Sequence, residues 1–428
     1  MPAFSLEPQQ AAWCAELRAL AAERLRPIAE KGEPGRVNRP LLAELGRLGL
    51  LDRLFTSGAL DLCLMRESLA YACTEAETAL ALQGLGAHPV HAHGTAAQRA
   101  RWLPAVADGS AVAAFALSEP DAGSDAAALT LRADPDPGPD PGFGSQGGLG
   151  PDPVPGEGRC AAPGGAPPKT ADGSAAAPVL AARPDGSRGW RLTGEKCWIS
   201  NAPEADVHTV FARTTPGAGS RGITAFLVPA DRPGLTGGAL EMLSPHPIGT
   251  LSFDGVPVTA DDVLGEVDRG FRVAMGTLNL FRPSVGAFAV GMAQAALEAT
   301  LAHTARRDAF GGKLSDLQTV AHQVAEMALR TEAARLMVYA AATAYDDGAP
   351  GVPGRVAMAK LLATETAQYV VDRAVQLHGA RALCRGHLLE HLYREVRAPR
   401  IYEGASEVQR GIIAKELYAA PRPTVEAP

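Results

Sequence analysis

The stretch RIYEGASEVQR, residues 400–410, places a single acidic residue, Glu403, between an aromatic residue and a glycine. Ser406 and Gln409 follow with the spacing S-x-x-Q, which predicts a capping box and a last helix that begins at about residue 407. Glu403 would then lie on a short turn just before that helix. Taken alone, this pattern is typical of a solvated carboxylate. Whether Glu403 has a functional role must therefore be judged from the rest of the chain.

Composition favours a soluble protein with several cores. The chain has 428 residues, 46% of them hydrophobic, a length that suggests roughly two to three domains. A formal net charge of −7 disfavours a general nucleic-acid binder, since phosphate neutralisation needs clustered Lys and Arg. The six cysteines show no CxxC spacing, and neither a signal peptide nor a long apolar run is evident. We therefore expect free thiols, a cytoplasmic location and no membrane span.

Three regions differ in periodicity. Residues 1–112 repeat apolar residues at helical spacing, whereas 113–265 contain short β-branched and aromatic runs separated by Gly, Pro and Asp. Residues 266–428 return to longer helical patterns. The sequence thus predicts an α+β multidomain fold, in which a helical domain and an antiparallel, barrel- or sandwich-like β-domain precede a four-helix bundle. The predicted bundle helices are 284–308, 314–346, 354–380 and 405–419.

A Pro- and Gly-rich segment interrupts the strand region. Fifteen of the 25 residues in 134–158 are Pro or Gly. The segment therefore has too little apolar surface for its burial to offset the cost of ordering the backbone. We expect a surface insertion at about 134–178, and a binding tail is the less favoured alternative.

Two histidine motifs have metal-like spacing. HLLEH (387–391) would place two histidines on one helix face, and HPVHAH (88–93) has three histidines close together. The first lies in a Leu-rich helix and lacks a third ligand, and the second has no nearby Cys or carboxylate. We expect no metal at either motif.

Two further segments carry polar groups at strand ends. FALSEPDAGSD (115–125) is rich in turn formers, and it also suits a loop whose N–H groups and hydroxyls face a polar ligand. WISNA (198–202) places a Trp beside two hydrogen-bonding residues, where the ring would pack in a core or against a flat cofactor.

Taken with RIYEGASEVQR, these segments resemble the acyl-CoA dehydrogenase family. SEPDAGSD and IYEGASEVQRGIIAKEL are similar to its two signatures, and RRDAFGGKLSDLQ (306–318) is similar to its flavin segment at the dimer interface. The resemblance extends from about residue 10 to 420 outside the insertion, with the segments in the family's order. It implies the family's three-domain fold and an FAD enzyme that removes two hydrogens from an acyl-CoA.

The resemblance also implies roles for individual residues. Glu403 stands where the family keeps the base that removes the α proton, while the β hydrogen passes as hydride to the flavin N5. The Glu403 backbone N–H and a flavin ribose hydroxyl would donate to the thioester oxygen, and Gly404 would allow close approach of the chain. The residues implied to bind FAD are Phe115, Leu117, Ser118, Gly123, Ser124, Trp198, Ile199, Ser200, Arg307, Phe310, Gln318, Gln376, Gly379, Ala405 and Glu407. Those implied to bind substrate are Ser124, Asn279, Arg282 and Gly404.

Several positions depart from the family pattern. Ala380 stands where a second Gly usually follows the QLHG segment, Asn279 where Asp is common, and Ala405 where Thr is common. Phe281, beside Arg282, lies where the family lines the acyl pocket with side chains of variable size. We expect its ring to favour short, branched or cyclic acyl groups.

The family default implies an electron-transfer flavoprotein as acceptor. It also implies a homotetramer, a dimer of dimers, in which Arg307, Phe310 and Gln318 reach the FAD of a neighbouring subunit. Gln376 and Gly379 match a second segment on the adenine or pyrophosphate side of FAD. Three alternatives stay open: a flavin oxidase, a dehydrogenase of carrier-protein thioesters, and a DNA-binding relative with little turnover. A DNA-binding protein would need a basic C-terminal face, which the acidic balance does not favour.

Overall fold

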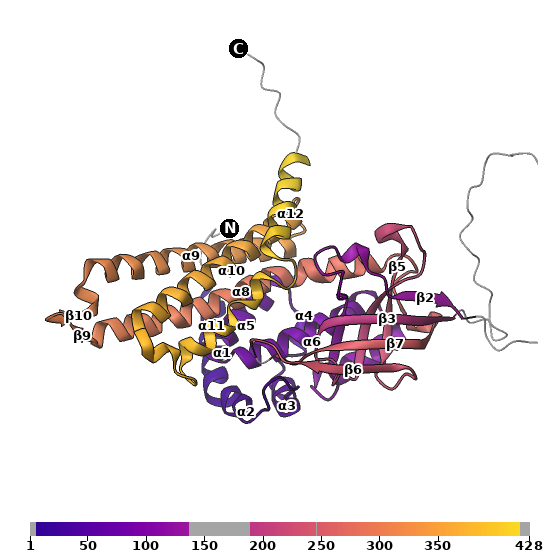
Figure 1. The fold of residues 1–428 in the computed structure, drawn as a ribbon, viewed down its shortest axis with the longest axis horizontal. Helices are drawn as coiled ribbons and strands as arrows, with labels where there is room; N and C mark the ends of the chain where they lie inside the picture. The colour runs from indigo at the N-terminus through magenta and orange to yellow at the C-terminus, as the bar shows by residue number, and fades with distance from the viewer. Residues whose placement is uncertain (1–5, 137–188, 245, 420–428) are drawn as a thin grey trace, which may run out of the picture.

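The computed structural model describes residues 6–136, 189–244 and 246–419. Most of the insertion predicted at 134–178 lies outside these residues. Within them, a helical region, a β-sheet and a long helical bundle follow one another along the chain, with the sheet at one end of the molecule and the bundle at the other (Figure 1).

The N-terminal region packs as short helices around two longer ones, α5 and α6. A capping box begins α7, where the Thr95 hydroxyl accepts the N–H of Gln98 and the Gln98 side chain accepts the N–H of Thr95. The helices are α1 (Pro8–Leu20), α2 (Arg26–Ala29), α3 (Arg39–Arg47), α4 (Arg53–Thr56), α5 (Ala59–Ala72), α6 (Thr74–His93) and α7 (Ala96–Ala107).

The middle region is one twisted sheet with strand order β6-β7-β3-β2-β4-β5-β8, and β1 pairs with β4. Its pairings are antiparallel except for β1 and β2 against β4, which are parallel. The strands are β1 (Ala113–Ala116), β2 (Arg132–Pro135), β3 (Gly189–Ser200), β4 (Val207–Arg213), β5 (Ile223–Pro229), β6 (Leu235–Leu240), β7 (Ile248–Thr259) and β8 (Val263–Leu264).

The C-terminal region is a bundle built on one central helix, α8, which begins at Gly270 rather than at the predicted residue 284. Pro283 lies inside it, because packing of the helix on both sides outweighs the one hydrogen bond that proline removes. A small hairpin follows α8 and forms the tip of the bundle. The elements are α8 (Gly270–Arg306), β9 (Asp308–Ala309), β10 (Gly312–Lys313), α9 (Gln318–Asp346), α10 (Val352–His378), α11 (Leu388–Glu395) and α12 (Ser406–Ala419).

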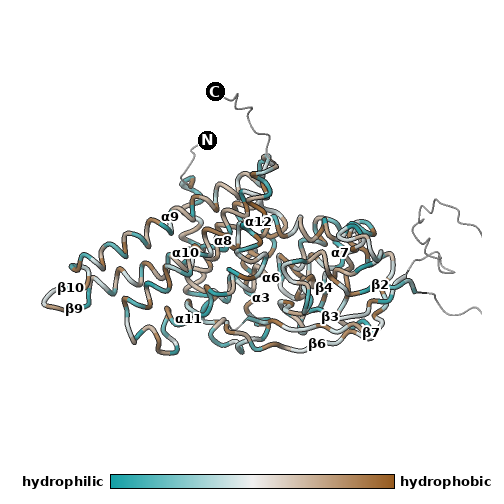
Figure 2. Tube along the Cα trace, turned by 45° about the horizontal axis from the view of Figure 1, so that its top comes forward, coloured by the Kyte–Doolittle hydropathy of each residue, from teal (hydrophilic) through white to brown (hydrophobic). Residues whose placement is uncertain are grey.

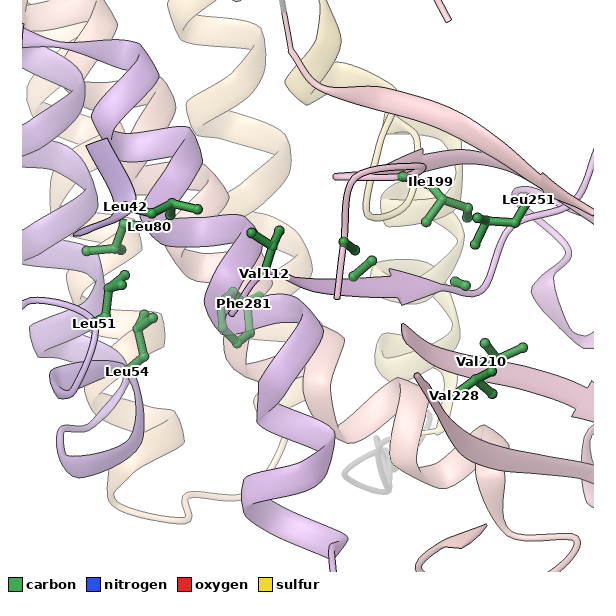
Figure 3. Close-up of a cluster of buried hydrophobic side chains, with 14 of the residues drawn as sticks. Leu42, Leu51, Leu54, Leu80, Val112, Ile199, Val210, Val228, Leu251 and Phe281 are labelled. Carbon is green, nitrogen blue, oxygen red and sulfur yellow. The ribbon is translucent and has the colours of Figure 1, made fainter. Parts of the chain in front are cut away.

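The cores join the three regions. One cluster of buried side chains extends from Leu42 and Leu80 on the N-terminal helices, through Phe281 on α8, to Val210 in the sheet (Figure 3). Colouring by hydropathy shows apolar residues recurring along the long helices and the strands (Figure 2). At Gly291, a Cβ atom would lie 2.3 Å from the backbone oxygen of Glu67, so this glycine permits the close contact of α8 with α5.

Helix α8 is also long and apolar enough to cross a membrane by length and composition alone. However, 72% of its most apolar window is buried within the fold. Its apolar character is accounted for by its central place in the bundle.

Candidate active site

Glu403 lies on a tight turn between α11 and α12, with φ of +51° at Glu403 and +98° at Gly404. Three side chains hold the turn by its carbonyl groups. Arg282 Nε donates to the Glu403 oxygen at 2.9 Å, and Lys360 Nζ donates to the Gly404 oxygen at 2.8 Å. Gln409 Nε2 donates to both oxygens, at 3.2 and 3.0 Å. Left-handed backbone at a non-glycine residue is costly, and these contacts from α8, α10 and α12 hold it in place.

The predicted capping box at Ser406 and Gln409 is wrong. The Ser406 hydroxyl donates to Glu365 Oε1 at 2.6 Å, and the N–H of Gln409 bonds to the Ala405 oxygen. Gln409 Nε2 donates to the two turn carbonyls, and its Oε1 accepts no hydrogen bond from the described residues, so no box is closed on the N–H of Ser406. Helix α12 therefore begins at Ser406, and its first turn holds the Glu403 turn by a different set of bonds.

The Glu403 carboxylate is buried without a full set of partners. Its Oε2 has no hydrogen-bond partner among the described residues. Burial raises the pKa of Glu403, while the charges of Arg66, Arg282 and Lys360 oppose that rise. An ionisable group with this environment and a free oxygen is suited to take a proton from a bound molecule.

The two predicted flavin segments lie side by side. The N–H of Cys197 donates to the Ser118 oxygen at 3.0 Å, and Asn201 Nδ2 donates to the Ala113 oxygen at 2.9 Å. Trp198 has φ of +57° and is 48% exposed, so its ring is not part of the core. Ser118 and Ser200 are half-buried on the same segments. An exposed ring with hydroxyl groups beside it fits a flat polar cofactor.

A buried ion pair that was not predicted from the sequence joins the segment 115–125 to the segment that contains Trp198. Lys196 Nζ donates to Glu119 Oε1 at 2.7 Å and to the Leu117 oxygen at 2.9 Å. Glu119 also accepts the N–H groups of Thr130 and Leu131. Burial lowers the pKa of Lys196 to about 8, because the nearby Glu119 charge only partly compensates. The pair fixes the spacing of the two segments.

Other predicted residues have side chains committed elsewhere. Ile199 is buried in the core beside Leu251 (Figure 3), and the ring of Phe115 packs on Phe211 with centroids 4.9 Å apart. Buried Leu117 likewise belongs to a core cluster. At these three positions the side chains contribute to the core rather than to a ligand surface. Ser124 and Gly123 are exposed on the intervening loop, and a Cβ atom on Gly123 would meet nothing within 4 Å.

Of the predicted substrate residues of α8, Arg282 contacts the Glu403 turn and Asn279 contacts Arg282. Arg282 NH1 donates to Asn279 Oδ1 at 3.3 Å, and the same guanidinium holds the Glu403 carbonyl. Ala405 is half-buried on the turn, and Glu407 is exposed beside Arg410.

Phe281, the residue before Arg282, is 1% exposed and packs against α6. A Cβ atom on Gly84 would lie 2.7 Å from its ring, and the ring edge faces His88 at a centroid distance of 6.1 Å. The ring therefore fills the space between α6 and α8.

A second group of predicted cofactor residues is far from Glu403 within one chain. Arg307 and Phe310 lie on the hairpin at the tip of the bundle, the end remote from the sheet (Figure 1). Phe310 has φ of +53° and is 90% exposed. Gln318, Gln376 and Gly379 are exposed at the helix ends nearest this hairpin. They form no single site with Trp198 in one chain.

The two histidine motifs have structural contacts. His387 Nδ1 accepts the N–H of Leu389 at the start of α11, and His391 Nε2 lies 2.6 Å from the Thr74 hydroxyl. Within the described residues, no group of three or more His, Cys, Asp or Glu side chains is placed to hold a metal ion.

Comparison with known proteins gives the family of the chain. Sequence models of the acyl-CoA dehydrogenase N-terminal, middle and C-terminal domains match residues 7–110, 169–256 and 268–418. The chain belongs to the acyl-CoA dehydrogenase family. It is an oxidoreductase that acts on CH–CH groups, and FAD is its cofactor, as the motifs predicted. The three-domain fold predicted from the sequence is confirmed.

Individual relatives cover nearly the whole chain. A probable acyl-CoA dehydrogenase of Mycobacterium tuberculosis is 31% identical, with 97% of this chain and 96% of the relative aligned. The short-chain specific acyl-CoA dehydrogenase of Bos taurus is 32% identical, over 94% of this chain and 88% of its own. The butyryl-CoA dehydrogenase structure from Megasphaera elsdenii has a TM-score of 0.80 and 28% identity, covering 97% of this chain and 99% of its own. The chain thus acts in acyl-CoA dehydrogenation.

Proposed function

We propose that this chain dehydrogenates a short-chain, branched or cyclic acyl-CoA to the trans-2-enoyl-CoA, with Glu403 as the base for the α proton. The observation that carries the proposal is the buried Oε2 of Glu403, which has no partner among the described residues. Its raised pKa makes the carboxylate a stronger base than an exposed one.

Residues around the turn supply the remaining requirements. Arg282, Lys360 and Gln409 donate hydrogen bonds to the carbonyls of the turn, so the backbone from which the Glu403 side chain projects is held in one position. The Glu403 backbone N–H has no backbone or side-chain acceptor among the described residues, which leaves it available to donate to a thioester oxygen. Such a donor acidifies the α carbon by stabilising the enolate-like charge. When bound, FAD accepts the β hydrogen as hydride.

The proposed preference for small acyl groups rests on Phe281. Its buried ring packs against α6, one residue before Arg282, and we infer that it removes space that a long straight chain would need. A relative 32% identical is named for short-chain specificity, and a structural neighbour for butyryl-CoA, which supports the same size class.

The assembly and electron acceptor are parts of the same proposal. The exposed residues at the bundle tip lie at the end of the molecule opposite the sheet whose strand β3 carries Trp198, which supports FAD shared between chains of a homotetramer (Figure 1). An electron-transfer flavoprotein is the proposed acceptor, since a neighbour at TM-score 0.80 and 27% identity comes from work on such a system. Free cysteines support the proposed cytoplasmic location.

The test uses the yellow, FAD-bound protein under anaerobic conditions. Short, branched, cyclic and long straight acyl-CoAs are added, and the loss of flavin absorbance is followed. We expect rapid bleaching by the small acyl groups. Glu403→Gln should still bind FAD and acyl-CoA but reduce the flavin about 100- to 10,000-fold more slowly.

Glu416→Gln, on the exposed side of α12, is the matched control and should keep the wild-type rate. A colourless protein, or equal bleaching by the Glu403→Gln and wild-type proteins, would contradict the proposal.

A further inference from the structure

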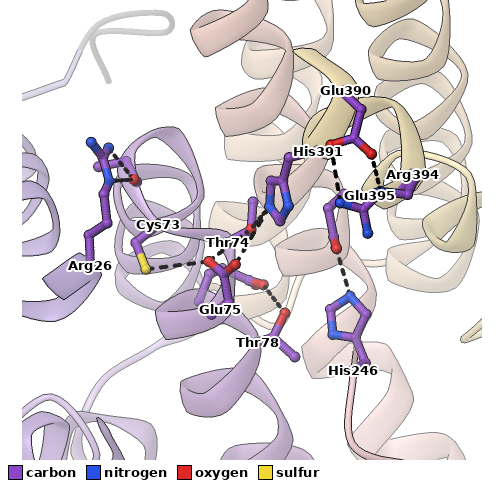
Figure 4. Close-up of polar contacts among 12 residues, drawn as sticks. Arg26, Cys73, Thr74, Glu75, Thr78, His246, Glu390, His391, Arg394 and Glu395 are labelled. Carbon is purple, nitrogen blue, oxygen red and sulfur yellow. Dashed lines mark hydrogen bonds and ion pairs between the residues drawn. The ribbon is translucent and has the colours of Figure 1, made fainter. Parts of the chain in front are cut away.

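A buried ion pair links the middle region to the bundle beside the active site. His246 Nε2 lies 2.7 Å from Glu395 Oε2, with side chains 15% and 2% exposed (Figure 4). His246 precedes β7 of the sheet, and Glu395 is the last residue of α11. The pair therefore joins two regions that are far apart in sequence.

On the sheet side, the pair is next to the flavin-facing strand. The Pro247 oxygen accepts the N–H of Asn201 at 2.6 Å, and Ile248 pairs with Ser200 in the ladder of β3 and β7. A movement of His246 would thus be transmitted to Ser200 and Asn201 through two directly bonded neighbours.

On the bundle side, the pair is next to the base. Only a 3₁₀ turn, Ala398–Arg400, separates α11 from the Glu403 turn. Burial raises the pKa of Tyr402, the residue before Glu403, and the charges of Glu77, Glu403 and Glu395 raise it further. The three carboxylates therefore lie close to the Tyr402 hydroxyl. The ion pair consequently connects the strand that bears Ser200 with the turn that bears Glu403.

The charges that face the pair favour its ionised form. Glu77 and Glu75 of α6 face His246, and His391 and Arg394 of α11 face Glu395. Glu77 is itself paired with Arg66 of α5. Burial opposes ionisation of His246, but Glu395 and the α6 carboxylates raise its pKa above the usual value. Burial likewise opposes ionisation of Glu395, but His246 outweighs it and lowers the pKa of that carboxyl.

Solvent reaches the pair through a pocket. Its inner wall includes Thr78, Asn201, His246 and Glu395, and its outer residues include exposed Glu30, Glu33 and Arg36 of the segment between α2 and α3. A proton can therefore leave or join His246 without unfolding. The pair is intact between the lowered pKa of Glu395 and the raised pKa of His246, and it is lost as pH rises through the latter.

We propose that His246 and Glu395 are a positioning pair for the dehydrogenation, holding Ser200 and Asn201 at a fixed place relative to the Glu403 turn while His246 is protonated. This inference rests on the proposed function for its effect on rate, since neither residue belongs to the predicted cofactor- or substrate-binding set. Reacting groups displaced by about 1 Å lose on the order of 100-fold in rate.

The test compares His246→Gln and Glu395→Gln with wild type in the FAD-bound protein. His322→Gln, an exposed histidine of α9, is the control. Flavin reduction in a single turnover is measured against pH. The wild-type rate should fall on the alkaline side as His246 loses its proton, and both variants should be about 10- to 100-fold slower at neutral pH and lack that alkaline limb. Acyl-CoA affinity should change much less than the rate.

A second readout does not depend on turnover. The absorbance spectrum of the unreacted flavin is titrated with base, and the wild type and His322→Gln should show a transition that both pair variants lack. If a pair variant fails to fold, His246→Lys is used in its place, because the lysine ammonium stays charged through this pH range. The flavin absorbance of His246→Lys should stay constant where that of the wild type changes.

The outcomes separate the two proposals. Wild-type rates and an unchanged alkaline limb in both pair variants, or a flavin transition that persists in His246→Lys, would overturn the positioning role. A flavin that no acyl-CoA bleaches would instead overturn the proposed function, while the spectral titration would still decide the pair.

Discussion

The two ends of α8 differ in almost every physical respect. Near its start, Phe281 and Arg282 are buried against α6 and the base turn, whereas at its end Arg307 and Phe310 are exposed on a hairpin. About 40 Å of helix separates the two phenylalanines, from the rise per residue. The first region is covered by other elements of the same chain, whereas the second is a surface that one chain leaves exposed. Buried and exposed versions of the same residue types therefore allow matched tests.

The largest expected contrast in stability is between a buried lysine of strand β3 and an exposed lysine of the hairpin. Lys196 forms a buried ion pair with Glu119, while Lys313 pairs with Asp308 on the exposed hairpin. Lys196→Met leaves a buried carboxylate uncompensated and should lower the free energy of unfolding by about 3–5 kcal/mol. Lys313→Met should change it by about 1 kcal/mol or less. Urea unfolding measures both, and equal losses would contradict the structural distinction.

Replacing Phe281 or Phe310 should give a contrast in stability of similar size. The two replacements should also affect different functions, acyl-chain preference and FAD retention. Phe281→Ala should cost about 3–5 kcal/mol through the cavity it leaves, and it should improve flavin reduction by longer acyl-CoAs relative to short ones. Phe310→Ser should scarcely alter the folding of a chain but should weaken retention of FAD. Thermal unfolding, the acyl-CoA panel and FAD release on dilution distinguish them. A Phe281→Ala protein with an unchanged chain-length profile would show that this ring does not limit the pocket.

Gly404→Ala tests the turn itself and should have a smaller effect. A Cβ atom there would lie 2.4 Å from Gln409 Nε2, and φ of +98° is unfavourable for alanine. We expect a loss of about 1–3 kcal/mol in stability. Gly411→Ala, where a Cβ atom on α12 meets nothing within 4 Å, should be neutral or slightly stabilising. If both changes behave alike in thermal unfolding, the turn is not constrained as described.

The order of domains and the main site segments could be predicted from the sequence because they depend on local patterns. Helical and strand periodicities distinguish the three regions, and Glu403, Ser118 and Trp198 stand in short signatures. The first bundle helix was predicted from residue 284, whereas α8 begins at Gly270 and contains Pro283, because the packing that tolerates the proline involves distant residues. The capping box at Ser406 failed for the same reason, because Glu365 and the turn carbonyls compete for its two side chains.

Buried charges were the main omission. Lys196, Lys360 and Arg66 have no local pattern that separates them from exposed residues of the same type, and their roles follow from partners at large sequence separation. The alternation of strand β3 places Lys196 on the same face as buried Leu192, which was the one available signal. Long-range pairing of this kind requires the folded structure.

The unpartnered carboxylate of Glu403 also implies a conflict between folding and activity. A group whose pKa is raised by burial favours the folded state when protonated, and that stabilisation is lost as pH rises through its folded pKa. At neutral pH, Glu403→Gln should therefore raise the melting temperature, by an amount equivalent to about 0.5–2 kcal/mol, and the gain should shrink in acid. Calorimetry of the two proteins across pH measures this, and a lower melting temperature for the variant at neutral pH would count against it. The fold is therefore expected to be more stable without the carboxylate that we propose as the base.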